Sequence, residues 1–244
     1  MKHYAHESPF KMVDSEGKEY LLTVLNSIEQ EAYIEDPRDW DNVCIMVCWH
    51  SHYALGDKHN FYDPDEFMQH LYLDVTSKHW CDDHDSDDWQ DVYKALQETN
   101  LVLIKPINMY DHSGITVSTS NGYPYNDRWD AGCVGFIYVT KKTALAEYGD
   151  ITEENWRERA DKGLEAEMEV YDQYLRGDVY GFTLEEKVHY RNETTCPHCG
   201  EVIKVDEYDT YEEVDSCCGF YGDCLEENSI IDNISADLKF VEEE

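Results

Sequence analysis

The alternation of apolar and polar positions predicts a protein that contains both strands and helices. Short apolar runs bounded by Gly, Pro, Asn or Asp are typical of strands. Such runs occupy residues 18–26, 42–50, 101–110, 114–119, 133–140 and 178–186. The run at 133–140, which reads CVGFIYVT, is expected to be a central strand.

Helices are predicted where apolar residues recur every three or four positions. These segments are 63–78, 85–98, 152–176 and 225–241. The longest begins at Thr152, which can cap a helix, and ends at Gly177. Its apolar stripe consists of Trp156, Ala160, Leu164, Met168, Tyr171 and Leu175.

The order of these elements predicts the α+β class, with a mixed or antiparallel sheet packed against several helices. We expect a core domain over residues 1–190 and a cysteine-rich, zinc-ribbon-like excursion over 191–224. An acidic helix over 225–244 is expected to pack on the core. No internal repeat or long linker interrupts this arrangement.

The charge balance narrows the classes of function. The chain has 54 acidic and 19 basic residues, a net charge of −35, and this self-repulsion works against a compact state. Its 19 tyrosines and six tryptophans indicate an ordered chain rather than a disordered acidic tail. The sequence has no basic patch or phosphate-binding loop, so we expect no direct contact with nucleic acid. The expected partner is a basic protein surface.

The hydropathy pattern favours a cytoplasmic protein. No apolar run approaches the roughly 20 residues that a membrane-spanning helix needs. The first residues, MKHYAHESPF, are polar and do not resemble a signal peptide. We therefore expect no membrane partner, and the oligomeric state stays open.

Two of the nine cysteines form the clearest chemical motif. Cys196 and Cys199 lie in CPHCG, and this spacing lets two thiolates reach one tetrahedral zinc ion. A second pair is needed, and Cys217 with Cys224 is the set that we predict, although Cys218 or His198 could replace a thiolate. Four thiolates leave no open position for a substrate, so the predicted zinc is structural. Free thiols, or catalytic or redox work, are the alternatives.

The remaining cysteines have other surroundings. Cys44, Cys48 and Cys133 lie in apolar runs, where a free cysteine behaves as a small core residue. Because the sequence lacks a secretion signal, we expect free thiols rather than a disulfide framework.

Several histidines and aspartates support an alternative hypothesis, in which the protein is an enzyme. The segment HSHYALGDKH loosely resembles the HxHxDH motif of metallo-β-lactamase-fold hydrolases, but extra residues break its spacing. A second segment, YDHSGITVSTS, invites a triad interpretation, although no GxSxG motif accompanies it. The residues of this hydrolase alternative are His50, His52, Asp57, His59, Asp111 and His112. For both segments, ordinary polar residues in turns beside strands are the interpretation that the sequence favours.

Two acidic tracts, residues 61–93 and 201–244, are the predicted partner-binding surfaces. Within the first tract, the segment HWCDDHDSDDW (residues 79–89) lacks the glycine and the closing glutamate of a calcium loop, so we interpret the tract as an acidic surface. The predicted contact residues are Asp82, Asp83, Asp85, Asp87, Asp88, Asp206, Glu207, Asp209, Glu212, Glu213 and Asp215. Carboxylates on folded elements can imitate the phosphates of DNA, which carries about one charge per 1.7 Å of axis.

Five phrases together resemble an uncharacterised family of proteins encoded by bacteriophages and related mobile elements. They are DPRDWDN…MVCWHSHYALGDKH, YDHSGITVSTS, WDAGCVGFIYV, YDQYLRGDVYGF and DSCCGFYGD, within residues 35–224. The family carries no established activity, so the resemblance implies no catalytic residue. It implies that the protein acts in the cytoplasm of a host bacterium, where defence complexes bind nucleic acid in basic channels.

Three hypotheses follow. The first is an anti-defence protein, such as an anti-CRISPR or antirestriction DNA mimic, that inhibits a nucleic-acid-targeting immune effector. The second is a metal-dependent hydrolase that acts on a nucleotide or a defence signalling molecule. The third is a phage structural or accessory protein whose acidity only increases its solubility.

Overall fold

The computed structural model describes residues 2–28, 34–112, 114–120, 131–149 and 151–241. The chain forms two compact units: unit 1 comprises residues 1–35 and 177–244, and unit 2 comprises residues 36–176. This division differs from the expected boundaries after residues 190 and 224. The reason is topological, because strands on either side of unit 2 pair with each other in unit 1.

Unit 2 is built on an antiparallel sheet with the strand order β3-β6-β4-β5. Its strands are β3 (Ile45–Cys48), β6 (Ala131–Thr140), β4 (Val102–Asp111) and β5 (Ile115–Ser118). As the sequence predicts for residues 133–140, β6 lies inside the sheet, between β3 and β4. A register shift between Ile107 and Asn108 interrupts the pairing of β4 with β6.

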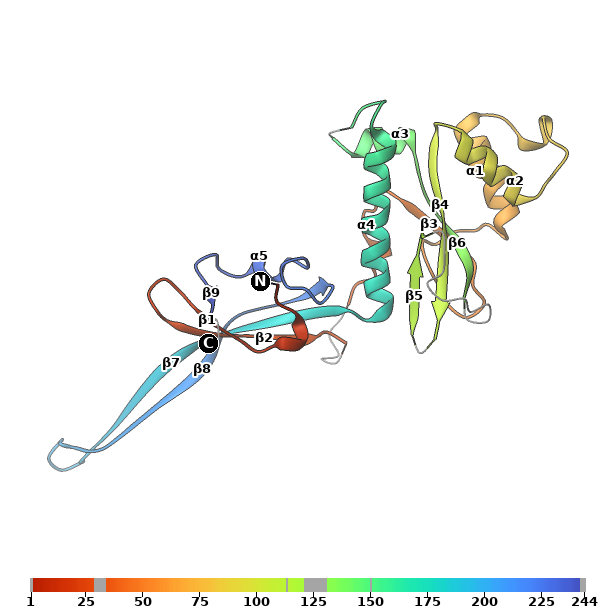
Figure 1. Cartoon of the computed structure of the whole chain (residues 1–244). Coiled ribbons are helices and arrows are strands. Elements are labelled where there is room, and N and C mark those ends of the chain that lie inside the picture. Colours follow the sequence, from red (N-terminus) through yellow and green to blue (C-terminus); the bar gives the residue numbers. More distant parts are fainter. Residues whose placement is uncertain (1, 29–33, 113, 121–130, 150, 242–244) are drawn as a thin grey trace. The chain divides into compact units, whose positions relative to one another are not determined.

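Helices cover both faces of this sheet (Figure 1). The α-helices of unit 2 are α1 (Pro64–Thr76), α2 (Trp89–Glu98), α3 (Lys141–Glu147) and α4 (Trp156–Arg176). The short 3₁₀ helices are η2 (Pro37–Asp39) and η3 (Trp80–Asp82). Neighbouring residues on β6 point to opposite faces: Ile137 lies in the core with α4, and Phe136 lies in the core with α1 and α2.

The predicted stripe of α4 is buried as expected. Trp156, Ala160, Leu164, Met168 and Tyr171 are at most 3% exposed. The helix begins later than predicted, at Trp156, whose backbone N–H donates to the Thr152 carbonyl at 3.0 Å. It ends before Gly177, whose φ of +77° lies in the left-handed region that favours glycine.

Unit 1 contains a second antiparallel sheet, with the order β8-β7-β2-β1-β9. Its strands are β8 (Val202–Tyr221), β7 (Val179–Thr195), β2 (Glu19–Asn26), β1 (Phe10–Val13) and β9 (Lys239–Phe240). A short 3₁₀ helix, η1 (Ala5–Glu7), and the helix α5 (Ile230–Asn233) complete this unit. Its core includes Leu22, Phe182 and Leu225. The predicted α+β class with antiparallel sheets is therefore confirmed.

The helix predicted near the C-terminus is wrong in extent. Residues 225–241 contain only the four-residue α5 and the two-residue β9. Ser229 has a positive φ of 68°, and the Asn228 side chain accepts a hydrogen bond from the Ile230 backbone N–H at 3.0 Å. Such local side-chain bonds compete with a helix. The end of the segment instead pairs with β1, with Phe240 opposite Met12.

The strands β7 and β8 are much longer than their neighbours. They pair from Val179↔Tyr221 to Thr195↔Val202, whereas β2 accompanies β7 only as far as Glu186. Beyond Glu186 the two strands continue alone as a hairpin, which we call the ribbon (residues 187–211; Figure 1). Most of its residues are exposed on both faces. The sequence predicts β7 only to residue 186, so the length of the ribbon is a structural finding.

Candidate functional site

The acidic loop of unit 2, residues 82–88, follows η3 and leads into α2. All five of its aspartates are exposed: Asp82, Asp83, Asp85, Asp87 and Asp88. Asp88 caps α2, because its carboxylate accepts a hydrogen bond from the Gln90 backbone N–H at 2.8 Å. Within the described parts of the chain, none of the five forms an ion pair with a basic side chain. Their negative charges therefore face solvent.

Aromatic packing anchors the acidic loop to the helices of unit 2. Trp80 is 4% exposed, and its indole N–H donates to the Ser86 carbonyl. The His84 ring stacks on Trp80 with ring centroids 3.5 Å apart and an angle of 2° between the planes. The Ser86 hydroxyl donates to Asp91 at 2.8 Å, and this bond is the main reason that the pKa of Asp91 is lowered. The loop thus presents its aspartates on an anchored backbone.

The acidic residues of β8 are exposed too, but several of them have basic partners. Asp206 lies 2.7 Å from Lys204 Nζ, and Glu207 lies 3.5 Å from Arg191 Nε. Asp209 accepts a hydrogen bond from His189 at 2.8 Å, and this bond contributes most to lowering the pKa of Asp209.

The other three predicted acids lie closer to the base of β8. Glu212 accepts a hydrogen bond from the Tyr190 hydroxyl, and Glu213 accepts one from Ser216 at 2.9 Å. Asp215 is also exposed, opposite Leu184. The negative charge of β8 is therefore partly neutralised, unlike that of the acidic loop.

The four cysteines predicted to bind zinc are not brought together. Cys196 and Cys199 lie in the turn at the tip of the ribbon, beyond the pair Thr195↔Val202. Cys217 lies opposite Phe182, outside the ribbon, where β7 also pairs with β2. The 13 residue-to-residue steps from Phe182 to Thr195 span roughly 40 Å at about 3.3 Å per step. Cys224 is buried beyond β8, and its thiol donates to Glu226 at 3.6 Å. The register of the hairpin thus places the four predicted thiols far apart in this structure.

The tip nevertheless has the backbone arrangement of a metal-binding knuckle. The Cys196 N–H donates to the Glu201 carbonyl at 2.7 Å, and the Gly200 N–H donates to the Cys196 carbonyl at 2.9 Å. Gly200 has a φ of +76°, which closes the turn. The backbone N–H groups of His198 and Cys199 donate to the Cys196 sulfur and lower the pKa of its thiol. In the described chain, no group of three or more His, Cys, Asp or Glu side chains could hold a metal.

Three residues of the hydrolase alternative lie around one cavity in unit 2. His50, His52 and Asp111 line a cavity of about 360 Å³, together with Cys133. The Tyr53 ring stacks on His50 at 5.1 Å, and its hydroxyl donates to Asp111 at 3.0 Å, which raises the pKa of Tyr53. This arrangement could position a proton donor beside two imidazoles.

The other three residues of that alternative have different surroundings. His59 shares a hydrogen bond with the Cys48 carbonyl at 2.9 Å and packs edge-on against Trp49. Asp57 is held by Arg38, and the His112 ring stacks on Tyr110 at 5.9 Å. The six residues therefore do not form a single metal centre among the described residues.

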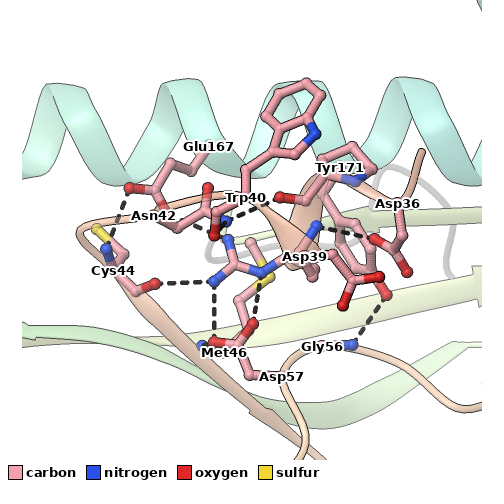
Figure 2. A network of polar contacts seen from close by, with 12 residues as sticks. Asp36, Asp39, Trp40, Asn42, Cys44, Met46, Gly56, Asp57, Glu167 and Tyr171 are labelled. Atoms are coloured by element: carbon pink, nitrogen blue, oxygen red, sulfur yellow. Dashed lines mark hydrogen bonds and ion pairs between the residues drawn. The ribbon is translucent and has the colours of Figure 1, made fainter.

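A buried arginine connects four segments of unit 2 (Figure 2). Arg38, whose side chain is 4% exposed, donates two bonds of 2.9 Å to Asp57 and one of 3.1 Å to Glu167. It also donates to the Cys44 carbonyl at 2.8 Å. Burial opposes the charge of Arg38, but the two carboxylates outweigh burial and raise its pKa.

The carboxylates of this network also bind the backbone of the β3 segment. Glu167 accepts bonds from the N–H groups of Val43 and Cys44, both at 3.1 Å. Asp57 accepts one from the Met46 N–H at 2.8 Å. The network thus joins η2, β3, the segment around Asp57, and α4. The bonds of Arg38, Asp57 and Glu167 to one another and to the backbone give this network a structural role.

Sequence reasoning did not identify Arg38 or Glu167. One signal was present: Glu167 lies three residues after Leu164 and four before Tyr171, on the apolar stripe of α4. A charged residue on an apolar stripe implies a buried partner. The identity of that partner was not readable, because Arg38 is 129 residues away in the chain.

Comparisons with protein-family models, curated proteins and solved structures find no match for this chain. The resemblance to phage-encoded proteins therefore stays a prediction. None of the helices in the described residues is long and apolar enough to cross a membrane.

Proposed function

We propose that the protein is an acidic binding protein that occupies the basic, nucleic-acid-binding surface of a bacterial defence effector. The observation that carries this proposal is the acidic loop, with five exposed aspartates within seven residues and no basic partner among the described residues. The phage-like sequence phrases supply the context of defence, in the host cytoplasm. A CRISPR or restriction complex is the expected class of target.

The charges favour binding by long-range attraction. A net charge of −35 accelerates association with a basic surface, and salt weakens such steering because the Debye length is about 8 Å at physiological ionic strength. The anchored loop presents its carboxylates without a large ordering cost on binding. We assign the leading role to the loop and a secondary role to the acids of β8, since basic neighbours already neutralise part of their charge.

The test is salt-dependent capture followed by competition. The tagged full-length chain is incubated at low ionic strength with lysate of a bacterium that carries CRISPR and restriction systems, and bound proteins are eluted with salt. We expect a nucleic-acid-binding effector that DNA or RNA displaces. Failure to capture any such effector, or capture that nucleic acid does not reduce, would contradict the proposal.

Two variants with the same change of charge separate the two acidic surfaces. The first replaces Asp82, Asp83, Asp85 and Asp87 by Asn and keeps Asp88, which caps α2. The second replaces Asp206 and Asp209 by Asn, and Glu207 and Glu212 by Gln. We expect the first to slow association on the order of tenfold and the second to have a smaller effect. Equal effects would show that only net charge matters.

The cavity around His50 supports a second candidate function, hydrolysis of a nucleotide or defence signal, in which a metal ion would need ligands beyond the described residues of the cavity. The observation in its favour is that His50, His52 and Asp111 line one cavity, and that Asp111 accepts a hydrogen bond from the Tyr53 hydroxyl. Turnover of cyclic or linear oligonucleotides with added Zn²⁺ or Mn²⁺ would support it. Unchanged turnover in His50→Ala would exclude this site.

A further inference from the structure

The tip of the ribbon carries half of a zinc site. Cys196 and Cys199 are two thiols in a turn that two backbone hydrogen bonds close, from the Cys196 N–H to the Glu201 carbonyl and from the Gly200 N–H to the Cys196 carbonyl. Cys199 is exposed, and Cys196 is partly exposed. Structural zinc sites are almost always four-coordinate, and the described residues contain no group of three or more His, Cys, Asp or Glu that could hold a metal. The Glu201 carboxylate accepts a hydrogen bond from the Cys199 thiol at 3.8 Å.

We propose that two copies of this chain bind one zinc ion between their ribbon tips, with Cys196 and Cys199 of each copy as the four ligands. Binding is a ligand exchange without oxidation or reduction. Four thiol protons leave to solvent as four sulfur–zinc bonds form, and the product is a tetrathiolate zinc centre. Two-fold symmetry satisfies the tetrahedral geometry, because each knuckle supplies the same pair of sulfurs.

The shape of the ribbon makes this contact accessible. From residue 187 onward the two strands pair only with each other, and the tip lies roughly 40 Å along the hairpin from the pair Phe182↔Cys217. The ribbon thus extends the two thiols away from the sheet of unit 1 (Figure 1). Cys217 and Cys218 lie near the base of the hairpin and cannot reach the tip of their own chain.

The charge at the tip also permits self-association. Residues 191–206 contain three acidic and two basic residues, whereas the whole chain has a net charge of −35. Charges more than about 8 Å apart in solvent are largely screened at physiological ionic strength. Two copies therefore repel each other less at their tips than at the acidic loop.

Apolar residues beside the knuckle add contact area. Val202, Ile203 and Val205 are 47%, 64% and 42% exposed, although all three are aliphatic. In a symmetric tip-to-tip contact, each can bury part of its surface against the second copy. A contact between two tips would explain why an otherwise polar hairpin carries aliphatic residues next to its cysteines.

The test is zinc-dependent dimerisation of the full-length protein. The chain is reduced, freed of metal and analysed by sedimentation velocity with increasing Zn²⁺, and bound metal is measured by mass spectrometry. We expect conversion from monomer to dimer with one zinc per two chains, and reversal by EDTA. Co²⁺ in place of Zn²⁺ should give the visible absorption of a tetrahedral thiolate site.

Matched serine variants locate the ligands. Cys199→Ser should abolish both the dimer and the Co²⁺ spectrum, and Cys196→Ser should do the same. Cys218→Ser is the control, because Cys218 is exposed but lies opposite Gly181, far from the tip. The variants keep the pairing of the ribbon, so circular dichroism should stay unchanged.

Four outcomes would overturn the proposal. They are a monomer with one zinc per chain, a dimer that EDTA leaves intact but a thiol reductant separates, no zinc binding, and equal loss in Cys218→Ser. No defence effector takes part in this assay. Its result is therefore independent of the proposed function.

Discussion

The sheet of unit 2 and the ribbon of unit 1 are both antiparallel, but they differ in what covers them. In the sheet, α4 packs on one face and α1 with α2 on the other, so Ile137 and Phe136 are at most 2% exposed. In the ribbon, Tyr190 and Tyr208 stack across the strands yet are 36% and 50% exposed. The covered sheet is a scaffold, and the bare ribbon is available to partners.

This difference shows that the pairing register of the strands is determined in two different ways. A slip of one residue in β6 would move Phe136 and Ile137 to the wrong cores, so burial determines the pairing. The ribbon has no buried face, and its register depends on its two ends. These are the sheet of unit 1 up to Glu186 and the turn around Cys196. Substitutions in the sheet of unit 2 should therefore lower the free energy of unfolding of that unit. Substitutions in the ribbon should destabilise only the ribbon itself.

The largest effect is expected from Arg38→Ala, which leaves Asp57 and Glu167 without their cation. Breaking a buried ion pair costs about 3–5 kcal/mol, and we expect the lower end because the two carboxylates are 24% and 17% exposed. All six tryptophans belong to unit 2, so urea unfolding followed by tryptophan fluorescence reports on this unit. Lys58→Ala, at an exposed lysine, is the control. A loss below 1 kcal/mol in Arg38→Ala would show that the network is dispensable.

A smaller effect is expected from Gly56→Ala. Gly56 has a φ of +70°, and an added Cβ would lie 2.8 Å from the Met46 carbonyl oxygen. Backbone strain of this kind costs about 1–3 kcal/mol. Gly149→Ala is the matched control, since its Cβ would have no neighbour within 4 Å. Thermal unfolding monitored by fluorescence measures both, and equal melting temperatures would contradict the expected clash.

The smallest effect is expected from Tyr208→Ala in the ribbon. Cross-strand aromatic pairs contribute roughly 0.2–1 kcal/mol, and here the loss should not reach the covered sheet. Hydrogen exchange should accelerate for amides of residues 189–211 while those of β4 and β6 keep their protection. Tyr211→Ala, at another exposed tyrosine of β8, controls for the loss of one ring outside the Tyr190 pair. Faster amide hydrogen exchange in β6 of Tyr208→Ala would contradict the view that the ribbon and the sheet of unit 2 are stabilised independently.

Local patterns predicted much of the covered part of the fold. The stripe on α4 and the central position of β6 follow from apolar spacing, as does the helix predicted from residue 63, where Asp63 caps α1. These features were readable because each depends on residues close together in the chain. The C-terminal helix was mispredicted for the opposite reason, since pairing of Phe240 with distant Met12 overrides the helical spacing.

The candidate sites show the same division. The sequence by itself determined the net charge, the exposed aspartates of the acidic loop and the two thiols of CPHCG, because composition and short spacing carry that information. Only the tertiary structure decided which of these groups meet. The register of β7 with β8 separates Cys196 from Cys217, and folding of α4 brings Glu167 to Arg38. Contacts between residues far apart in the chain depend on packing and register, which no local pattern encodes.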